Sequence, residues 1–170
     1  MTLTRRLARW RVPLGYVLAI VAFWLASPTA ATLAIGAVVG AIGEAFRIWA
    51  AGHLEKGREV TSSGPYALTR HPLYVGSSIM GAGFAIAANS LAVAIAVGVY
   101  LAVTITAAIR SEEAHLTDKF GGDYPAYRSG AAAAADRRFS LERALRNKEY
   151  RALAGFALVL VLLAVKCYLL

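Results

Sequence analysis

Long apolar blocks alternate with short polar segments from residue 12 onward. A helix that crosses the hydrocarbon core of a bilayer needs roughly 20 mostly apolar residues. The blocks approach this length and predict five transmembrane helices, at residues 12–26, 30–51, 73–88, 91–109 and 152–170. We therefore expect an all-α fold, a polytopic membrane helical bundle that forms a single domain over residues 1–170.

The first apolar block has a second interpretation. Arginines precede it and a Ser-Pro-Thr-Ala-Ala stretch follows it, an arrangement that resembles a secretory signal peptide. Four apolar blocks would still remain after cleavage, and this favours a retained helix. The Ser-Pro-Thr turn would then join the first two helices into a hairpin over residues 12–51.

The overall composition agrees with a membrane protein. Apolar side chains make up 58% of the residues and the mean hydropathy is +0.56, whereas a soluble domain of this length needs more polar surface. The single cysteine, Cys167, excludes an intrachain disulfide, and no cysteine cluster indicates zinc or iron–sulfur. We expect no metal site.

The distribution of basic residues predicts the orientation of the helices. The net charge is +8, and all Lys and Arg residues except Lys166 lie before the first predicted helix or at or after the ends of the second and fourth. The turns at residues 27–29 and 89–90 carry no charge. Because basic segments stay inside, we expect a cytoplasmic N-terminus, an external C-terminus and cytoplasmic segments at residues 52–72 and 110–151. Nucleic acid is not an expected partner.

The segment at residues 129–151 combines positive charge with apolar side chains. Within it, the pattern over residues 137–151 predicts an interfacial amphipathic helix on anionic lipid. Binding of an acidic partner is the alternative. The residues that make the pattern are Arg138, Phe139, Leu141, Arg143, Leu145, Arg146 and Lys148.

The second predicted helix carries a charged pair and a glycine pair, and neither is needed simply to cross a membrane. Glu44 and Arg47 lie three positions apart, and intramembrane charges are functional candidates unless they form a mutual ion pair near the interface. Gly36 and Gly40 form a G-x-x-x-G pair, which permits close helix packing.

Three polar motifs carry the candidate chemistry. The first, at residues 63–76, reads Ser-Gly-Pro-Tyr-Ala-Leu-Thr-Arg-His-Pro-Leu-Tyr-Val-Gly and leads into the third helix; its aromatic and basic residues would otherwise be interfacial anchors. The second, Arg110-Ser111-Glu112-Glu113, follows the fourth helix, where adjacent acids oppose the helix dipole and indicate a cationic partner or a solvated helix end. The third, Phe120-Gly121 with Tyr124 and Tyr127, presents two tyrosines on one face.

Together the three motifs resemble the isoprenylcysteine carboxyl methyltransferase and phospholipid methyltransferase superfamily. That family shows G-P-Y-x-x-x-R-H-P-x-Y-x-G before a transmembrane helix, then an E-E pair, then F-G-x-x-Y-x-x-Y. The resemblance covers residues 52–128 in the same order and spacing. The last helix lies outside the motifs, and residues 131–135 replace a proline-containing segment common in the family.

The resemblance implies S-adenosylmethionine as the cofactor, in a pocket at the cytoplasmic face of a bacterial-type inner membrane. Its binding residues would be Tyr66, Arg70, His71, Pro72, Leu73, Tyr74, Gly76, Glu112 and Glu113. Glu113 and Arg110 would be the catalytic residues, with Arg110 pairing with a carboxylate or phosphate of the acceptor. We expect His71 and Tyr74 within about 15 Å of the acid pair, because one small cofactor spans little more.

The expected reaction is methyl transfer to a lipid or a prenylated small molecule or protein, of the isoprenylcysteine carboxyl O-methyltransferase type. Phospholipid N-methylation remains open. Membrane sterol reductases share a related R-H-P-x-Y signature and use NADPH, but the E-E pair followed by Phe120-Gly121 favours the methyltransferase. A non-catalytic membrane scaffold is a further alternative.

Overall fold

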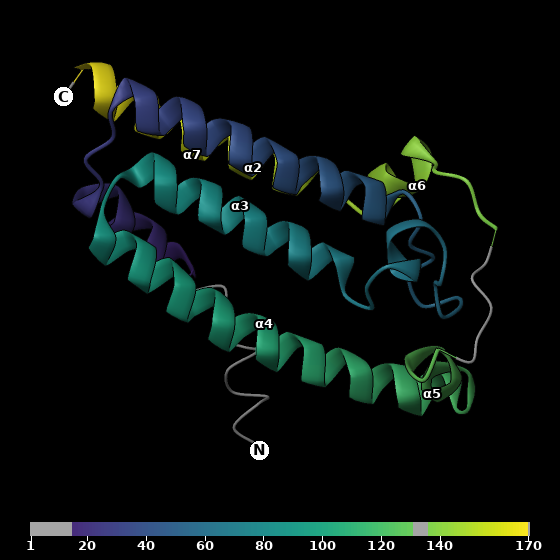
Figure 1. The fold of residues 1–170 in the computed structure, drawn as a ribbon. Helices are drawn as coiled ribbons and strands as arrows, with labels where there is room; N and C mark the ends of the chain where they lie inside the picture. Colours follow the sequence, from purple (N-terminus) through teal and green to yellow (C-terminus); the bar gives the residue numbers. More distant parts are fainter. Residues whose placement is uncertain (1–14, 131–135, 170) are drawn as a thin grey trace.

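The computed structural model describes residues 15–130 and 136–169, and within these residues all regular secondary structure is helical (Figure 1). The expected all-α fold is confirmed. A first helix covers Gly15–Leu25 among the described residues. The further elements are α2 (Ala30–Ala51), the 3-10 helix η1 (Gly64–Ala67), α3 (Pro72–Ala88), α4 (Leu91–Phe120), α5 (Asp123–Arg128), α6 (Leu141–Arg146) and α7 (Tyr150–Leu169).

Three of the helices, α2, α4 and α7, are long and apolar enough to cross a membrane. The helix Gly15–Leu25 and α3 are apolar but shorter; the 17 residues of α3 correspond to about 25 Å at 1.5 Å per residue, against a hydrocarbon core of about 30 Å. The chain is thus a multi-pass membrane protein, and a complete set of five spans stays a prediction.

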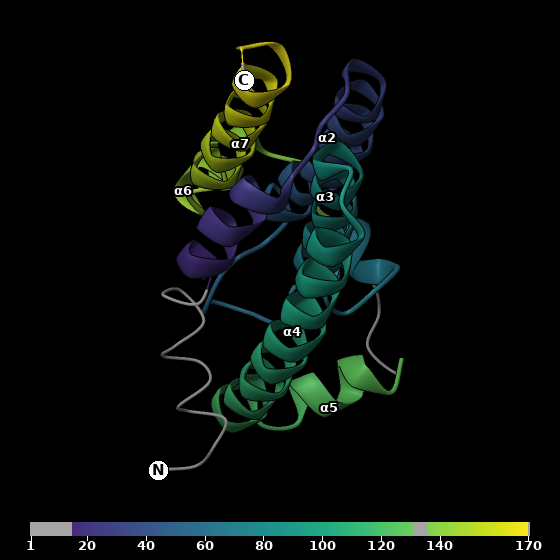
Figure 2. The ribbon, with the colours of Figure 1, turned by 90° about the vertical axis from the view of Figure 1, so that its left-hand side faces the viewer.

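The helices lie side by side with two distinct ends. α2 and α3 run together along their length, α7 packs on α2, and α4 starts beside α3 and then diverges from it (Figures 1 and 2). The loop of residues 52–71, α5 and α6 gather at one end, which we call the loop end. The short turns before α2 and between α3 and α4 form the opposite, turn end.

Glycines allow α2 and α3 to approach each other closely. A Cβ added at Gly83 of α3 would lie 2.5 Å from the amide nitrogen of Gly40 and 2.6 Å from the carbonyl oxygen of Gly36. Nearer the loop end, a Cβ at Gly43 would lie 2.7 Å from the carbonyl oxygen of Gly76. Such distances leave no room for a side chain, so the expected small-residue packing is confirmed and extends over both helices.

Hydrogen bonds close the turn end. The Ser27 amide donates to the Ala88 carbonyl at 2.8 Å, and the Asn89 side chain donates to the Ser27 carbonyl at 3.0 Å. Lys166 of α7 donates to the carbonyls of Phe23 and Trp24, the last turn of the first helix. A cation is favourable at a helix C-terminus, which gives the one basic residue outside the predicted cytoplasmic segments a structural role.

The amphipathic helix expected over residues 137–151 is shorter and interrupted in the structure, because α6 covers only Leu141–Arg146 and a turn separates it from α7. Residues 131–135 lie outside the described part of the chain, and the helix that follows, α6, has only six residues. Arg143 donates through Nε to Glu55 at 2.8 Å, and its hydrogen bond lowers the pKa of that carboxyl. Arg143, which was expected to face lipid, thus attaches α6 to the loop of residues 52–71. The apolar side chains of Leu141 and Leu145 are exposed.

Candidate functional site

The residues that lead into α3 meet the last third of α4 in a cluster of charged side chains. His71 Nε2 lies 3.2 Å from Oε1 of Glu113, from which it is separated by 42 positions in the sequence. Arg70 approaches the same oxygen at 3.4 Å, and His71 Nδ1 lies 4.0 Å from Oε2 of Glu112. The expected proximity of the two motifs is confirmed, because the turn at Asn89 folds α4 back along α3.

The start of α3 places His71 at the edge of this cluster. Pro72 occupies the first turn, where its fixed φ and missing amide hydrogen suit a helix start. The His71 carbonyl accepts hydrogen bonds from the amides of Tyr74 and Val75. These bonds fix His71 as the residue that precedes the helix. Its imidazole ring points toward α4.

The position of the acid pair differs from the sequence prediction. The sequence placed Glu112 and Glu113 at the C-terminal end of a helix, but α4 continues to Phe120, about two turns further. The argument from the helix dipole is therefore wrong. The side chain of Glu113 is 21% exposed and that of Glu112 is 45% exposed, so Glu113 is the inner acid, which the basic partners hold, and Glu112 is the outer one.

Tyrosines surround the charged cluster. The Tyr74 ring lies 5.9 Å from the His71 ring, and the Tyr127 hydroxyl donates to the Tyr66 carbonyl at 2.6 Å. Burial raises the pKa of Tyr66, and burial next to the charge of Glu113 raises the pKa of Tyr124 to about 12. Both phenols stay protonated at neutral pH and remain able to donate hydrogen bonds.

The hydroxyl of Tyr124 is buried beside the carboxylate of Glu113. It lies close enough to Glu113 for a hydrogen bond, but that contact is poorly aligned, and the hydroxyl has no other partner within the described residues. Such a group beside a carboxylate fits a polar ligand that would complete its hydrogen bonding.

Several of the predicted site residues lie outside the cluster or have a different role. Arg110 is exposed on α4 and forms no ion pair within 4.0 Å in the described part of the chain. Gly76 faces α2, where a Cβ would lie 2.5 Å from Cγ of Arg47. Leu73 contributes its carbonyl, which accepts a hydrogen bond from Arg47. Gly76 and Leu73 therefore serve helix packing, and a cofactor role for them and for Arg110 stays a prediction.

Sequence reasoning found one acidic partner of Arg47 and missed the other. The ion pair with Glu44, one of the two interpretations of their spacing, is present at 3.9 Å, and Nε of Arg47 also donates to Oε1 of Glu149 at 2.6 Å. Glu149 precedes α7 and lies 102 positions from Arg47. The sequence signal was weak, because Glu149 is one of three acids in the segment at residues 129–151, with Asp136 and Glu142.

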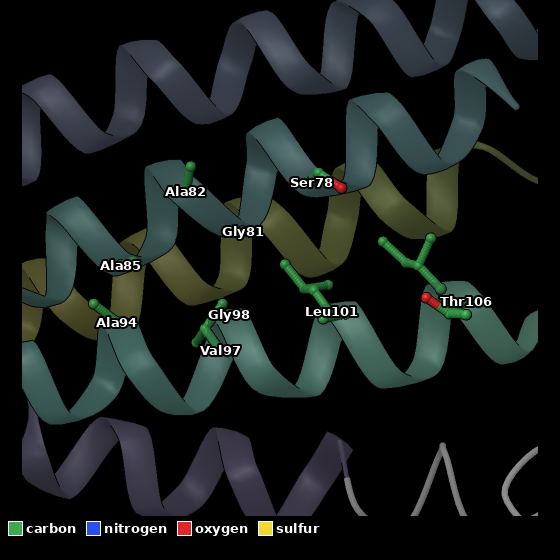
Figure 3. Close-up of a pocket in the computed structure, with 11 residues that line it drawn as sticks. Ser78, Gly81, Ala82, Ala85, Ala94, Val97, Gly98, Leu101 and Thr106 are labelled. Carbon is green, nitrogen blue, oxygen red and sulfur yellow. The ribbon is translucent and has the colours of Figure 1, made fainter. Parts of the chain in front are cut away.

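An apolar groove lies between α3 and α4, on the side of the cluster toward the turn end. Its volume is about 470 Å³, and Figure 3 shows small residues of both helices along it, with the hydroxyls of Ser78 and Thr106 among them. Ser78 follows His71, and Thr106 precedes Glu113, by about two turns, or roughly 10 Å along each helix. The groove therefore ends close to the charged cluster.

The sequence is similar to one protein family and to two bacterial metal-resistance proteins. A family model described as phospholipid methyltransferase matches residues 10–123. The chain is 35% identical over 130 residues to the cobalt-zinc-cadmium resistance protein CzcN of Cupriavidus metallidurans, an alignment that covers 69% of this chain and 58% of that protein. It is 29% identical over 129 residues to the nickel-cobalt-cadmium resistance protein NccN of Alcaligenes xylosoxydans xylosoxydans, covering 69% of this chain and 59% of that protein. No solved structure matches the chain at a comparable level.

Proposed function

The chain belongs to the phospholipid methyltransferase family, and from this premise we propose that it is a membrane methyltransferase that uses S-adenosylmethionine and a lipid-like acceptor. The observation that carries the proposal is the meeting of two sites of opposite character. The charged cluster of Arg70, His71 and Glu113 suits a polar, zwitterionic cofactor, and the apolar groove between α3 and α4 suits an acyl or prenyl chain. A methyltransferase for lipids requires these two sites side by side.

The residues of the cluster fit the cofactor group by group. Arg70 and His71 would hold its carboxylate, and Glu112 or Glu113 its ribose or amino group, through charge-assisted hydrogen bonds. The buried hydroxyl of Tyr124, beside Glu113, would be a further donor at this place. When bound, the cofactor supplies an activated methyl group, so the protein has chiefly to align the reactants and exclude water.

The two glutamates would act mainly in binding. Positive charge on sulfur falls as the methyl group is transferred, so a carboxylate near the sulfonium stabilises the ground state more than the transition state. The buried rings of Tyr66 and Tyr124 shield the cluster from water. Glu113, as the inner acid, would determine the position of the donor.

The acceptor reaction we favour is O-methylation of the isoprenylcysteine carboxylate type. Arg110 lies on α4 about one turn from Thr106, at the end of the groove, and about one turn from Glu113. An exposed guanidinium there would orient the negative group of an acceptor whose chain lies in the groove. A carboxylate is ionised at neutral pH and needs no general base, whereas an amine must lose a proton. Phospholipid N-methylation is the alternative.

The basic residues support a definite orientation in the membrane. The loop end holds Arg58, Arg137, Arg143 and Arg146, and the turn end holds Lys166 in a helix-capping contact. With five spans, the loop end and the cofactor site would lie at the cytoplasmic face of a bacterial-type inner membrane, because basic segments favour that side. The C-terminal end of α7 then faces the exterior.

Equilibrium binding to the purified protein tests the proposed cofactor. We expect saturable binding of radiolabelled S-adenosylmethionine and no binding of NADPH. Binding of NADPH alone would indicate the sterol-type reductase, and binding of neither would indicate a scaffold. If methyl transfer to a lipid extract follows, alkaline release of the label as methanol identifies an ester, and N-methyl label is retained.

A second candidate function comes from the names of the two relatives, which record resistance to cobalt, zinc, cadmium or nickel. Methylation of a membrane component would then contribute to metal tolerance. Growth of a deletion strain in zinc or cobalt tests this, with complementation by the wild type and by Glu113→Gln. Rescue by both proteins would show that metal tolerance does not depend on the charged cluster.

A further inference from the structure

The guanidinium of Arg47 joins three helices close to the charged cluster without touching it. From α2, its Nε donates to Glu149 at 2.6 Å, immediately before α7. Its Nη1 donates to the Leu73 carbonyl at 3.2 Å and to the Ser77 hydroxyl at 2.5 Å, both in the first two turns of α3. We propose that the Arg47–Glu149 pair is a positioning clamp that holds the start of α3, and with it His71, at its distance from Glu113.

The polar attachment of the start of α3 to α2 is made by this clamp, in addition to the backbone packing of Gly43 on Gly76. His71 makes no side-chain capping hydrogen bond, and Pro72 has no amide hydrogen to contribute. On the α2 side, Gly76 packs directly on the aliphatic part of Arg47. On the α4 side the helices diverge, and the contact is made by the side chains of Arg70 and His71 with the acid pair. A shift of this turn would therefore change the geometry of the cluster directly.

Two buried acids lie within reach of Arg47, and they differ in what they bind. Glu149 is 6% exposed and accepts the 2.6 Å hydrogen bond. Glu44 is 2% exposed, lies 3.9 Å from the same Nε, and has no hydrogen-bond partner for either oxygen in the described residues. The two residues form a natural pair for comparison, since each can be changed to the isosteric glutamine.

Loss of Glu149 would leave a poorly hydrated guanidinium, which is 19% exposed, without its hydrogen-bonded acid. An unpaired buried charge is strongly unfavourable. The nearest remaining acid is Glu44, and rotation of Arg47 toward it would draw Nη1 away from Leu73 and Ser77. Loss of Glu44 breaks no hydrogen bond and leaves the clamp intact.

The role of the clamp in cofactor binding rests on the proposed function, so the test uses two independent measurements on the full-length protein in detergent. Calorimetric titration gives the Kd for S-adenosylmethionine well below the unfolding temperature. Amide hydrogen exchange reports the start of α3 whether or not the cofactor binds. We expect Glu149→Gln to weaken binding by about tenfold and to speed exchange selectively at residues 73–77. Glu44→Gln should change the Kd less than about twofold and leave this exchange unaltered.

A double mutant separates positioning from general stability. If Glu149 acts through His71, then Glu149→Gln should have little further effect on the Kd in a His71→Ala background. Lys166→Met, which removes a contact at the turn end, should lower the melting temperature without changing the Kd. If Glu149→Gln does not fold, Arg47→Lys replaces it as the test variant, because lysine keeps the charge near Glu149 but cannot also reach Leu73 and Ser77 as a fork.

The outcomes distinguish the clamp from the proposed function. The clamp proposal would be overturned if the wild type binds the cofactor and the Glu149→Gln variant binds it with the same Kd. Faster exchange spread evenly over α2, α3 and α7 would overturn it as well, since that pattern indicates a general loss of stability. A wild type that does not bind the cofactor would refute the proposed function, while selective exchange at residues 73–77 would still support the clamp.

Discussion

The two faces of α3 use the same kind of residue to opposite effect. Toward α2, the glycines of both helices oppose each other, and added side chains at Gly83 or Gly76 would overlap the backbone of α2. Toward α4, small residues line a groove of about 470 Å³, and a Cβ at Gly98 would meet nothing within 4 Å. One face is closed by contact between backbones, and the other is open.

The difference shows that small residues alone do not determine whether two helices pack or leave space. On the α2 face, glycine stands opposite glycine at matching heights, so the backbones meet and van der Waals contact stabilises the pair. On the α4 face, Leu101 fills the space at Gly81, and the helices then diverge toward the loop end. We infer that the closed face supports the fold and that the open face serves the substrate.

The largest effect should follow from adding a methyl group to the closed face. Gly83→Ala would bring a Cβ within 2.5 Å of Gly40, and the helices would have to separate. We expect a loss of about 2–3 kcal/mol in the free energy of unfolding. Gly98→Ala, on the open face, should cause no loss. Denaturant unfolding of the two variants in detergent compares them; equal stability would contradict the distinction between the faces.

The next effect concerns the cluster at the junction of α3 and α4. Glu113→Gln removes the carboxylate charge that both Arg70 and His71 approach. A lost charge-assisted hydrogen bond costs about 1.5–3 kcal/mol, or roughly ten- to a hundred-fold in affinity for S-adenosylmethionine. Glu112→Gln should have a smaller effect, because Glu112 is more exposed. Calorimetric titration measures both, and unchanged affinity in both would refute a binding role for the acid pair.

A bulky residue on the open face should act on the acceptor alone. Gly98→Phe would place an aromatic ring in the groove, where the wild type has space. We expect the KM for a lipid-like acceptor to rise by about tenfold, equivalent to about 1.4 kcal/mol, while the Kd for S-adenosylmethionine stays the same. A kinetic series with acceptors of increasing chain length measures this. A KM that does not respond to the new ring would exclude the groove as the acceptor site.

The smallest effect should come from the tyrosines that join α5 to η1. Tyr127→Phe removes the hydrogen bond to the Tyr66 carbonyl and should cost about 0.5–1.5 kcal/mol in unfolding free energy. Its effect on cofactor affinity should be below that of Glu113→Gln, because the Tyr127 hydroxyl bonds to the backbone of Tyr66 and not to the acid pair. Thermal melting with matched titrations checks the order of the two variants.

Much of the fold follows from the sequence because lipid imposes a simple rule. The apolar blocks gave α2 and α3 to within a residue, and the turn at residue 89 predicted that His71 and Glu113 would meet. The end of α4 was missed because the prediction relied on hydropathy alone. Hydropathy falls after residue 109, but helical structure continues to Phe120, because a helix that leaves the membrane loses its apolar environment and not its backbone hydrogen bonds.

The pairing of distant charges is what the sequence does not reveal. Spacing indicated the ion pair of Arg47 with Glu44 one turn away, which is present, but not its hydrogen bond to Glu149, the residue before α7. Similarly, Arg143 belongs to a segment that appears lipid-facing by composition, but it binds Glu55. Contacts between residues far apart depend on how helices pack, and hydrophobic periodicity carries no information on such partners.

Methyl transfer from radiolabelled S-adenosylmethionine to membranes that contain the protein is the most direct test of the central claim, that the junction of α3 and α4 joins a cofactor site to a lipid site. We expect label in the organic-soluble or prenylated fraction with the wild type. Glu113→Gln should abolish most of it through the cofactor, and Gly98→Phe should reduce it through the acceptor. The account would be contradicted by no transfer from a correctly folded wild type, or by transfer that neither substitution changes.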